Sequence, residues 1–176
     1  RLLFISWADS CSRSDHTARE LGGRSFMVYA GSLGSRHATI ALKYLVQWRR
    51  TAQLLRREQP DTVIVMTPPL FAALPALWYA WRHDVRIVVD AHTCAFVLPR
   101  WKRLQALQLA ICRRVSTTFV TNDHLARLVE SAGAHATIVP DVPVEFAATT
   151  AFRRPSRPCR VGAGAWHHCP ASWLRL

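Results

Sequence analysis

The chain has 176 residues, of which half are apolar, and a net charge of +12. This composition excludes an intrinsically disordered protein, which lacks the apolar residues needed to bury a core. The longest apolar run, residues 70–81, is well short of the roughly 20 residues that cross a bilayer, so we expect no membrane-spanning helix.

Strands and helices are predicted to alternate along the chain. Strands are expected at residues 2–6, 25–30, 62–66, 86–89, 117–121 and 137–139. Helices are expected at residues 12–21, 40–59, 70–81, 101–113 and 122–132, the last with Thr121 or Asn122 as N-cap. This pattern predicts an α/β fold with a Rossmann-like, doubly wound parallel sheet of about six strands.

The end of the chain has a different composition. Residues 151–176 contain five arginines and no Asp or Glu, and they show no helical or strand period. We therefore predict a domain at residues 1–147, followed at 148–176 by a linker and an irregular basic tail. Two interpretations of the tail stay open, a reading-frame shift or truncated gene and a disordered basic tail.

Asp90 and His92 follow an apolar, β-branched run at residues 86–89. Open α/β sheets bind ligands in the crevice outside the carboxyl ends of their strands. Asp90 could orient His92 as a general base or as a phosphate ligand. The alternative is structural, with Asp90 capping a loop and His92 making an ordinary hydrogen bond.

A second polar group, with Arg13, Ser14 and His16, opens the helix expected at residues 12–21. Hydroxyls, an arginine and free N–H groups at a helix start suit an anion or a sugar, whereas ordinary N-capping is the alternative. The turn after the first strand lacks the glycines of a dinucleotide fingerprint, and no Walker A motif occurs. We expect no cofactor, and no metal site, because the histidines and cysteine at 167–169 lack a second ligand pair.

Four motifs resemble the N-terminal half of a GT-B glycosyltransferase, specifically the glycosyltransferase family 4-like N-terminal domain. They are the arginine-rich helix at residues 44–57, the strand and turn at 60–69, the strand and His-bearing loop at 88–93, and the pair of segments at 119–122 and 138–141. The resemblance implies sugar transfer from a nucleotide-sugar donor to a glycan acceptor, which is often lipid-linked in such enzymes. It also implies that a C-terminal Rossmann-like domain, which we do not find in this sequence, holds most of the nucleotide.

The resemblance implies roles for individual residues. His92 and Asp90 would stand at the reaction centre. The substrate-binding residues would be Arg13, Ser14, His16, Thr121, Asn122 and Asp141. Because the donor-binding half is missing from the sequence, we expect the fragment to be inactive alone.

The basic helices suggest a surface for a lipid-linked acceptor. Basic and aromatic side chains together dock on anionic membranes. The candidates are Trp48, Arg49, Arg50, Trp101, Lys102 and Arg103. The alternative is a solvated helix face with tryptophans in the core. The first interpretation predicts a cytoplasmic protein that is peripheral at the inner face of the plasma membrane.

Two other classes of function stay open on sequence grounds. A basic α/β module could bind nucleic acid, although no docking motif is present and five of the positive charges lie in the tail, so we expect no nucleic-acid partner. A non-catalytic remnant is the other class. The five scattered cysteines include no C-x-x-C pair, which indicates reduced thiols in a cytosolic protein.

Overall fold

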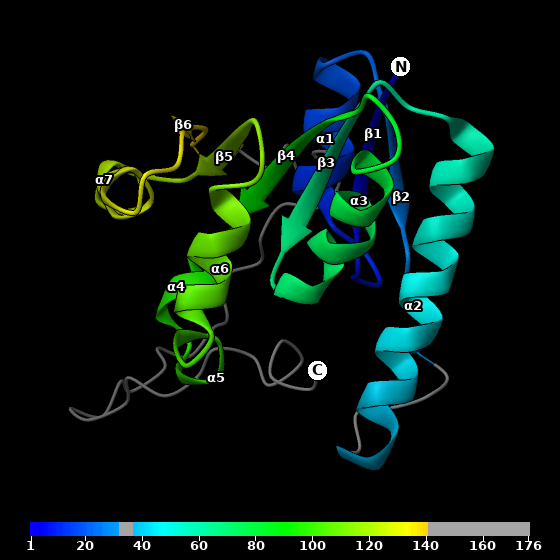
Figure 1. Cartoon of the computed structure of the whole chain (residues 1–176), viewed down its shortest axis with the longest axis horizontal. Coiled ribbons are helices and arrows are strands. Elements are labelled where there is room, and N and C mark those ends of the chain that lie inside the picture. The colour runs from blue at the N-terminus through cyan, green and yellow to red at the C-terminus, as the bar shows by residue number, and fades with distance from the viewer. Residues whose placement is uncertain (32–36, 141–176) are drawn as a thin grey trace, which may run out of the picture. The chain divides into compact units, whose positions relative to one another are not determined.

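The computed structural model describes residues 1–31 and 37–140 of the chain. These residues form a six-stranded sheet in the order β2-β1-β3-β4-β5-β6, in which every neighbouring pair is parallel (Figure 1). The strands are β1 (Leu2–Ser6), β2 (Arg24–Met27), β3 (Thr62–Thr67), β4 (Arg86–Ala91), β5 (Thr117–Val120) and β6 (Ala136–Ile138). The predicted fold class is confirmed.

The helices connect successive strands. They are α1 (Ser12–Glu20), α2 (His37–Glu58), η2 (Leu70–Ala72), α3 (Ala73–Ala80), α4 (Cys94–Val97), α5 (Pro99–Lys102), α6 (Gln105–Cys112) and α7 (Asp123–Ser131). Several predicted boundaries differ from the structure. The expected helix at 70–81 begins as the 3-10 turn η2. The expected helix at 101–113 is divided into α5 and α6. The second strand ends at Met27, because Met27 pairs with Ser6, which is the last residue of β1.

The short helix α4 was not predicted, since four residues are too few to show a helical period. Pro75 lies inside the first turn of α3, where its missing N–H has no partner to lose. The sequence period therefore locates the long helices but not the one-turn pieces around the sheet edge.

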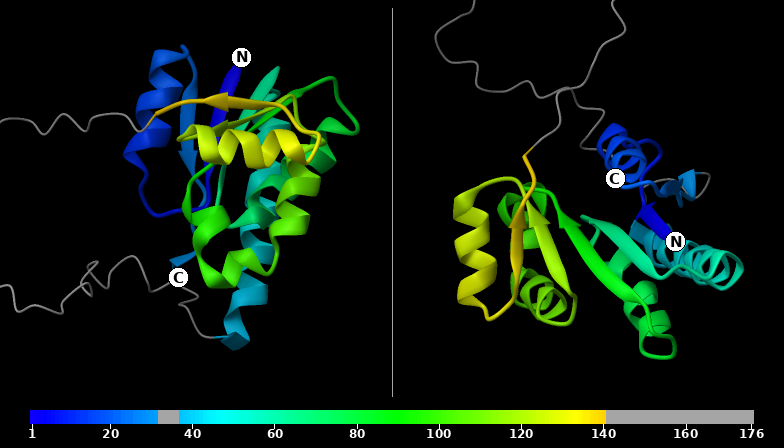
Figure 2. Two further views of the ribbon diagram at one scale, coloured as in Figure 1. Left: turned by 90° about the vertical axis from the view of Figure 1, so that its left-hand side faces the viewer. Right: turned by 90° about the horizontal axis from the view of Figure 1, so that it is seen from above.

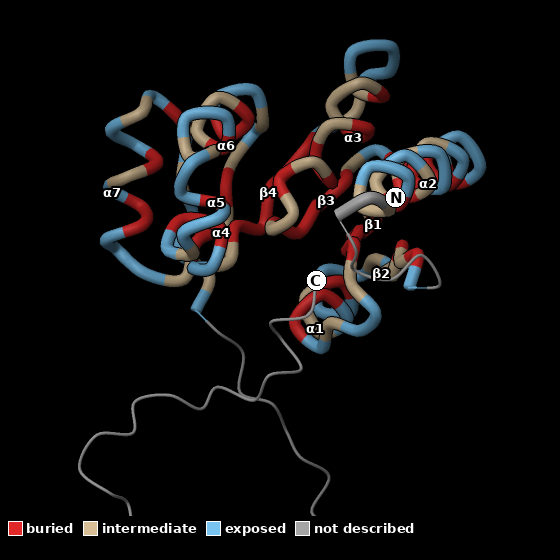
Figure 3. Tube along the Cα trace, turned by 90° about the horizontal axis from the view of Figure 1, so that it is seen from below, coloured by how far each residue is buried: buried red, intermediate tan, exposed pale blue. Residues whose placement is uncertain are grey.

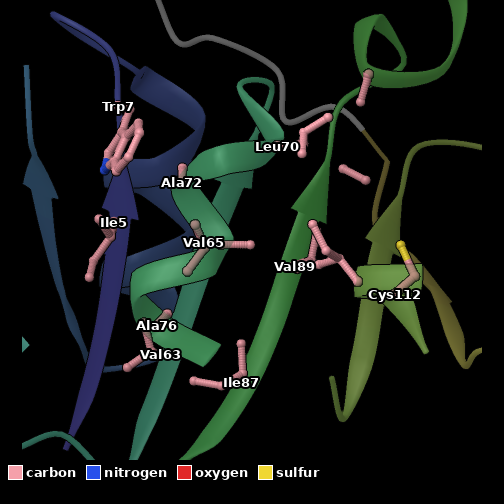
Figure 4. Packing of buried hydrophobic residues seen from close by; sticks show 14 of the residues in the cluster. Ile5, Trp7, Val63, Val65, Leu70, Ala72, Ala76, Ile87, Val89 and Cys112 are labelled. Carbon is pink, nitrogen blue, oxygen red and sulfur yellow. The ribbon is translucent and has the colours of Figure 1, made fainter. Parts of the chain in front are cut away.

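Side chains alternate between the two faces of the sheet and form two hydrophobic clusters. One cluster packs under α2, α3, α6 and α7, and the other packs under α1 (Figures 2 and 3). The first contains the strand residues Ile5, Val63, Val65, Ile87 and Val89, which Figure 4 shows against Ala72 and Ala76. The second contains Phe4, Ile64, Met66 and Val88. The central strands are thus buried on both faces, as their continuous apolar runs predict.

The strand order sets the position of the site. The chain moves from β1 to β2 in one direction and returns past β1 to β3 in the other, so the order reverses between β1 and β3. Ligands of doubly wound sheets bind at such a switch point, outside the carboxyl ends of the strands. Among the described residues, no helix is long and apolar enough to span a membrane. The predicted domain boundary at residue 147 lies outside them.

Candidate active site at the carboxyl ends of β1, β3 and β4

A buried ion pair between Arg13 and Asp90 forms the base of the site. Arg13 Nε lies 3.0 Å from Asp90 Oδ2, and Arg13 Nη2 lies 3.1 Å from Asp90 Oδ1. The two residues are only 8% and 1% exposed. A buried charge is costly unless it is paired and hydrogen-bonded, and this two-pronged contact satisfies both conditions. The pair joins the first helix to the end of β4.

Arg13 also reaches the chain beyond β6. Its Nη2 donates to the carbonyl of Val139 and its Nη1 to the carbonyl of Pro140, each at 3.1 Å. One guanidinium therefore connects α1, β4 and the segment after β6. These protein contacts occupy its donors, so in this structure Arg13 fixes the orientation of Asp90 instead of presenting an open anion site.

His92 is the first residue after β4 and lies directly above this ion pair. Its backbone N–H donates to the carbonyl of Thr67 at 3.0 Å, and its Nε2 lies 3.8 Å from Asp90 Oδ2. Its side chain is 29% exposed. Among the described residues, no donor or acceptor makes an aligned hydrogen bond to the buried Nε2. The imidazole is thus held beside a carboxylate with one polar atom still unsatisfied.

The Cys11 side chain raises the pKa of His92 above its ordinary 6.5. Burial of the ring acts against this shift, the negative charge of Asp90 adds to it, and the positive charge of Arg13 opposes it. A histidine whose pKa is raised from 6.5 keeps its proton further into the neutral range, where a general acid or base works best.

Cys11 is the residue that the sequence did not single out. It is the N-cap of α1, and its Sγ lies 3.4 Å from Met66 Sδ at the end of β3. Burial raises the pKa of the Cys11 thiol, but the interactions with His92 and Ser14 outweigh burial, so the net shift is downward from 9.0. Only its position at an expected helix start could have drawn attention to it, because His92 follows β4, which is two strands from β1 in the sheet.

The other predicted residues of the first helix lie in two different environments. Ser14 is fully buried, and its hydroxyl shares a 2.6 Å hydrogen bond with the hydroxyl of Ser6. His16 is half-buried and lines a depression of about 260 Å³, whose other described lining residues are Thr17, Glu20, Leu21, Phe119 and Val139. Ser14 therefore packs against the ends of β1 and β3 through Ser6 and Met66, whereas His16 faces a mostly apolar hollow.

Thr121 and Asn122 lie at the end of β5, next to the loop that carries His92. The hydroxyls of Thr93 and Thr121 are 2.9 Å apart. Asn122 Oδ1 accepts from the backbone N–H of Leu125 at 3.0 Å, so Asn122 is the N-cap of α7, one of the two caps predicted. A substrate-binding role for both residues stays a prediction. Asp141 lies outside the described residues.

A buried glutamine is connected to His92 through Thr67. Gln108 of α6 is 1% exposed, and its Nε2 donates to the hydroxyl of Thr67 at 3.2 Å. Thr67 in turn holds the backbone of His92. Sequence reasoning missed this connection, since a glutamine on a predicted amphipathic helix is usually solvated. Within the described residues, no group of histidine, cysteine or acidic side chains could hold a metal ion.

A comparison with known families identifies the domain. Residues 8–145 match the family model of the glycosyl transferase 4-like domain, which covers more than half of the chain. The chain belongs to this family. No curated protein matches it. The predicted family is confirmed, and with it a glycosyltransferase-type function in general.

The two tryptophans of the suggested membrane surface follow the alternative interpretation, in which they pack in the core. Trp101 is only 8% exposed, and Trp48 is half-buried against the same hydrophobic cluster, so both pack in the core. The exposed apolar side chains nearby are instead Leu42 and Leu45, at 50% and 51% exposure. They lie in the N-terminal half of α2, which extends beyond the carboxyl ends of the strands (Figure 1).

Proposed function

We propose that this chain is the acceptor-side domain of an enzyme that moves a sugar from a nucleotide-sugar donor to a lipid-linked glycan acceptor. Family membership supports sugar transfer. The carrying observation is the position of His92 and Asp90, 3.8 Å apart beside the point where the strand order reverses. A polar, titratable pair at that point of a doubly wound sheet is where substrate is expected.

In this proposal His92 touches the substrate, and Asp90 and Arg13 position it. The half-buried imidazole accepts or returns the proton of the acceptor hydroxyl at the reacting centre. Asp90 favours the protonated imidazole through its charge, and Arg13 holds Asp90 in place by the contacts at 3.0 and 3.1 Å. The carboxylate beside the ring is thereby held in place before substrate binds.

We further propose that the chain alone does not turn over. The described residues build one α/β unit, whereas exclusion of water and alignment of a donor need groups from both walls of a two-domain cleft. We expect no transfer from any nucleotide-sugar to an isoprenoid-phosphate acceptor. Measurable turnover in a radiolabelled-sugar assay would contradict this part of the proposal.

Acceptor binding tests the location of the site. Farnesyl phosphate, a short isoprenoid phosphate, is titrated into the labelled chain and followed by NMR. We expect saturable chemical-shift changes at the carboxyl ends of β1, β3 and β4. In His92→Ala the affinity for farnesyl phosphate should fall at least tenfold. His124→Ala is the matched control, because His124 is exposed on α7. Changes confined to other surfaces, or DNA binding that survives deletion of residues 151–176, would refute the assignment.

A lipid-linked acceptor also implies contact with a membrane surface. Leu42 and Leu45 are exposed on α2 and are followed by exposed Arg49 and Arg50, a combination that suits insertion beside anionic headgroups. We expect binding to vesicles that contain phosphatidylglycerol to weaken in Leu45→Ser. Leu21→Ser is the matched control, since Leu21 is 50% exposed and lies just after the end of α1, away from α2 in the sequence. Equal binding by both variants would argue against this surface.

A further inference from the structure

We propose that the hollow between α2 and the edge strand β2 binds a phosphomonoester that carries a compact apolar body. The hollow has a volume of about 420 Å³, which falls within the range of small-molecule sites, about 300–1,000 Å³. None of its described lining residues belongs to the cluster of Arg13, Asp90 and His92. The proposal therefore concerns a second ligand site and does not depend on sugar transfer.

The hollow follows the edge of the sheet and one face of α2. Among the described residues, β2 has a strand neighbour on one side only, and α2 lies near it (Figure 1). The helix is joined to the chain just after β2, because Gln47 Nε2 donates to the carbonyl of Val28 at 2.9 Å. The apolar lining includes Phe26, Val28 and Leu54, and the polar lining includes Arg50, Gln53 and Arg57. The α2 members recur at helical spacing, so one face of the helix presents them together.

Two cations meet at Tyr29, which also lines the hollow. Arg50 Nη1 donates to the Tyr29 carbonyl at 2.8 Å, and Lys43 Nζ lies 4.4 Å from the centre of the Tyr29 ring. Lys43 is only 6% exposed. Within the described residues, neither cation forms an ion pair with a carboxylate. A buried charge is costly without a counter-charge, and an aromatic face supplies only part of one. A bound anion would supply the rest.

The arginines near the hollow outnumber their acidic partner. Glu58, which is 5% exposed, is the carboxylate that they share. Arg1, Arg24 and Arg57 approach it at 2.9, 3.3 and 2.9 Å. One carboxylate cannot neutralise three guanidinium groups, so positive charge remains beside the wall of the hollow. A phosphomonoester brings about two negative charges at neutral pH, and its oxygens match the paired N–H donors of arginine. The excess charge therefore favours a phosphate over a singly charged carboxylate.

The polar and apolar parts of the lining define the two parts of the ligand. Arg50 uses one of its N–H donors on the Tyr29 carbonyl, which leaves others for phosphate oxygens. Gln53 places an exposed amide on the same wall. Phe26 and Leu54 offer apolar surface, and covering it with a small ring or a short alkyl group is favourable. The ligand class is thus a phosphate ester of a small apolar group.

Phenyl phosphate, a phosphomonoester with one apolar ring, tests the location of the site. It is titrated into the labelled chain at pH 7.5 and followed by NMR. We expect saturable chemical-shift changes at residues 26–29 and 50–57. Inorganic phosphate lacks the ring and benzyl alcohol lacks the phosphate, so each should bind at least fivefold more weakly than phenyl phosphate. Shift changes confined to the carboxyl ends of β3 and β4, or equal binding of benzyl alcohol, overturn the proposal.

A pair of charge-removing variants tests the role of Arg50. In Arg50→Gln the affinity for phenyl phosphate should fall about tenfold, because a charge-assisted hydrogen bond is lost. Arg56→Gln is the matched control and should bind as the wild type does. Arg56 is exposed on the same helix, but its guanidinium lies 5.7 Å from the Trp78 ring and is not part of the described lining. Equal losses in both variants indicate a general attraction to basic surface and overturn the proposal. If Arg50→Gln does not fold, the shift changes of the wild type decide alone.

Vesicles that contain phosphatidic acid, a lipid phosphomonoester, identify the source of the phosphate. Sedimentation of the chain with these vesicles, weakened by Arg50→Gln and by excess phenyl phosphate but not by Arg56→Gln, supports the proposal and assigns the site to a lipid headgroup. Saturable binding of phenyl phosphate without sedimentation supports it equally and assigns the site to a soluble phosphate ester. Binding of neither probe overturns the proposal.

Discussion

Replacement of Arg13 by methionine should lower the free energy of unfolding of the chain, because Arg13 connects α1, β4 and the segment after β6. The substitution keeps an unbranched apolar stem but leaves the Asp90 carboxylate, which is 1% exposed, without its counter-charge. Removing one partner of a buried ion pair costs about 3–5 kcal/mol. The carbonyls of Val139 and Pro140 lose their donor as well. For a chain of this size the expected fall in Tm is about 6–20 °C.

Urea unfolding, followed by tryptophan fluorescence and circular dichroism, measures this loss. Arg19→Met is the matched control, because Arg19 is exposed on the same helix and its replacement should cost at most about 0.5 kcal/mol. Adding Asp90→Leu to Arg13→Met removes the stranded charge, so the double variant should regain about 2 kcal/mol or more. A loss of stability below about 1 kcal/mol for Arg13→Met, or no recovery in the double variant, would refute the stabilising role of the Arg13–Asp90 ion pair.

Three further outcomes are expected in the same unfolding assay. Asn122→Ala removes the N-cap acceptor of α7 and should cost about 1 kcal/mol, and no loss would mean that another group caps the helix. Trp101→Ala should cost about 3–5 kcal/mol because the ring is 8% exposed, whereas Trp81→Ala, at 78% exposure, should stay within about 0.5 kcal/mol. The raised pKa of His92 means that the folded chain binds this proton more tightly than the unfolded chain. Its contribution is therefore complete below the ordinary 6.5 and is lost as pH rises through the folded-state pKa, so the stability difference between wild type and His92→Gln should shrink from pH 6 to 8.5. A difference that grows with pH would contradict the sign of the shift.

The sequence alone determined the fold class and the order of the elements. Short runs rich in β-branched residues, such as residues 62–66, indicate strands buried on both faces, and their alternation with amphipathic helices favours a parallel sheet. It also pointed to one edge of the sheet as the candidate site, because Asp90 and His92 lie at the end of a strand, and polar groups at strand ends gather at one edge of a parallel sheet. These properties are local, so a single stretch of chain carries them.

Only the tertiary structure decided what each polar group does there. Arg13 and Asp90 are 77 positions apart in sequence, and nothing in the local sequence indicates that the arginine pairs with this carboxylate. The same holds for Cys11: burial raises its pKa, and the interaction that lowers it comes from His92, which follows β4, two strands from β1 in the sheet. Burial and long-range pairing set the charge state of a side chain, and both depend on which strands are neighbours. A sequence gives the residue types at a sheet edge, but the strand order decides which of them meet.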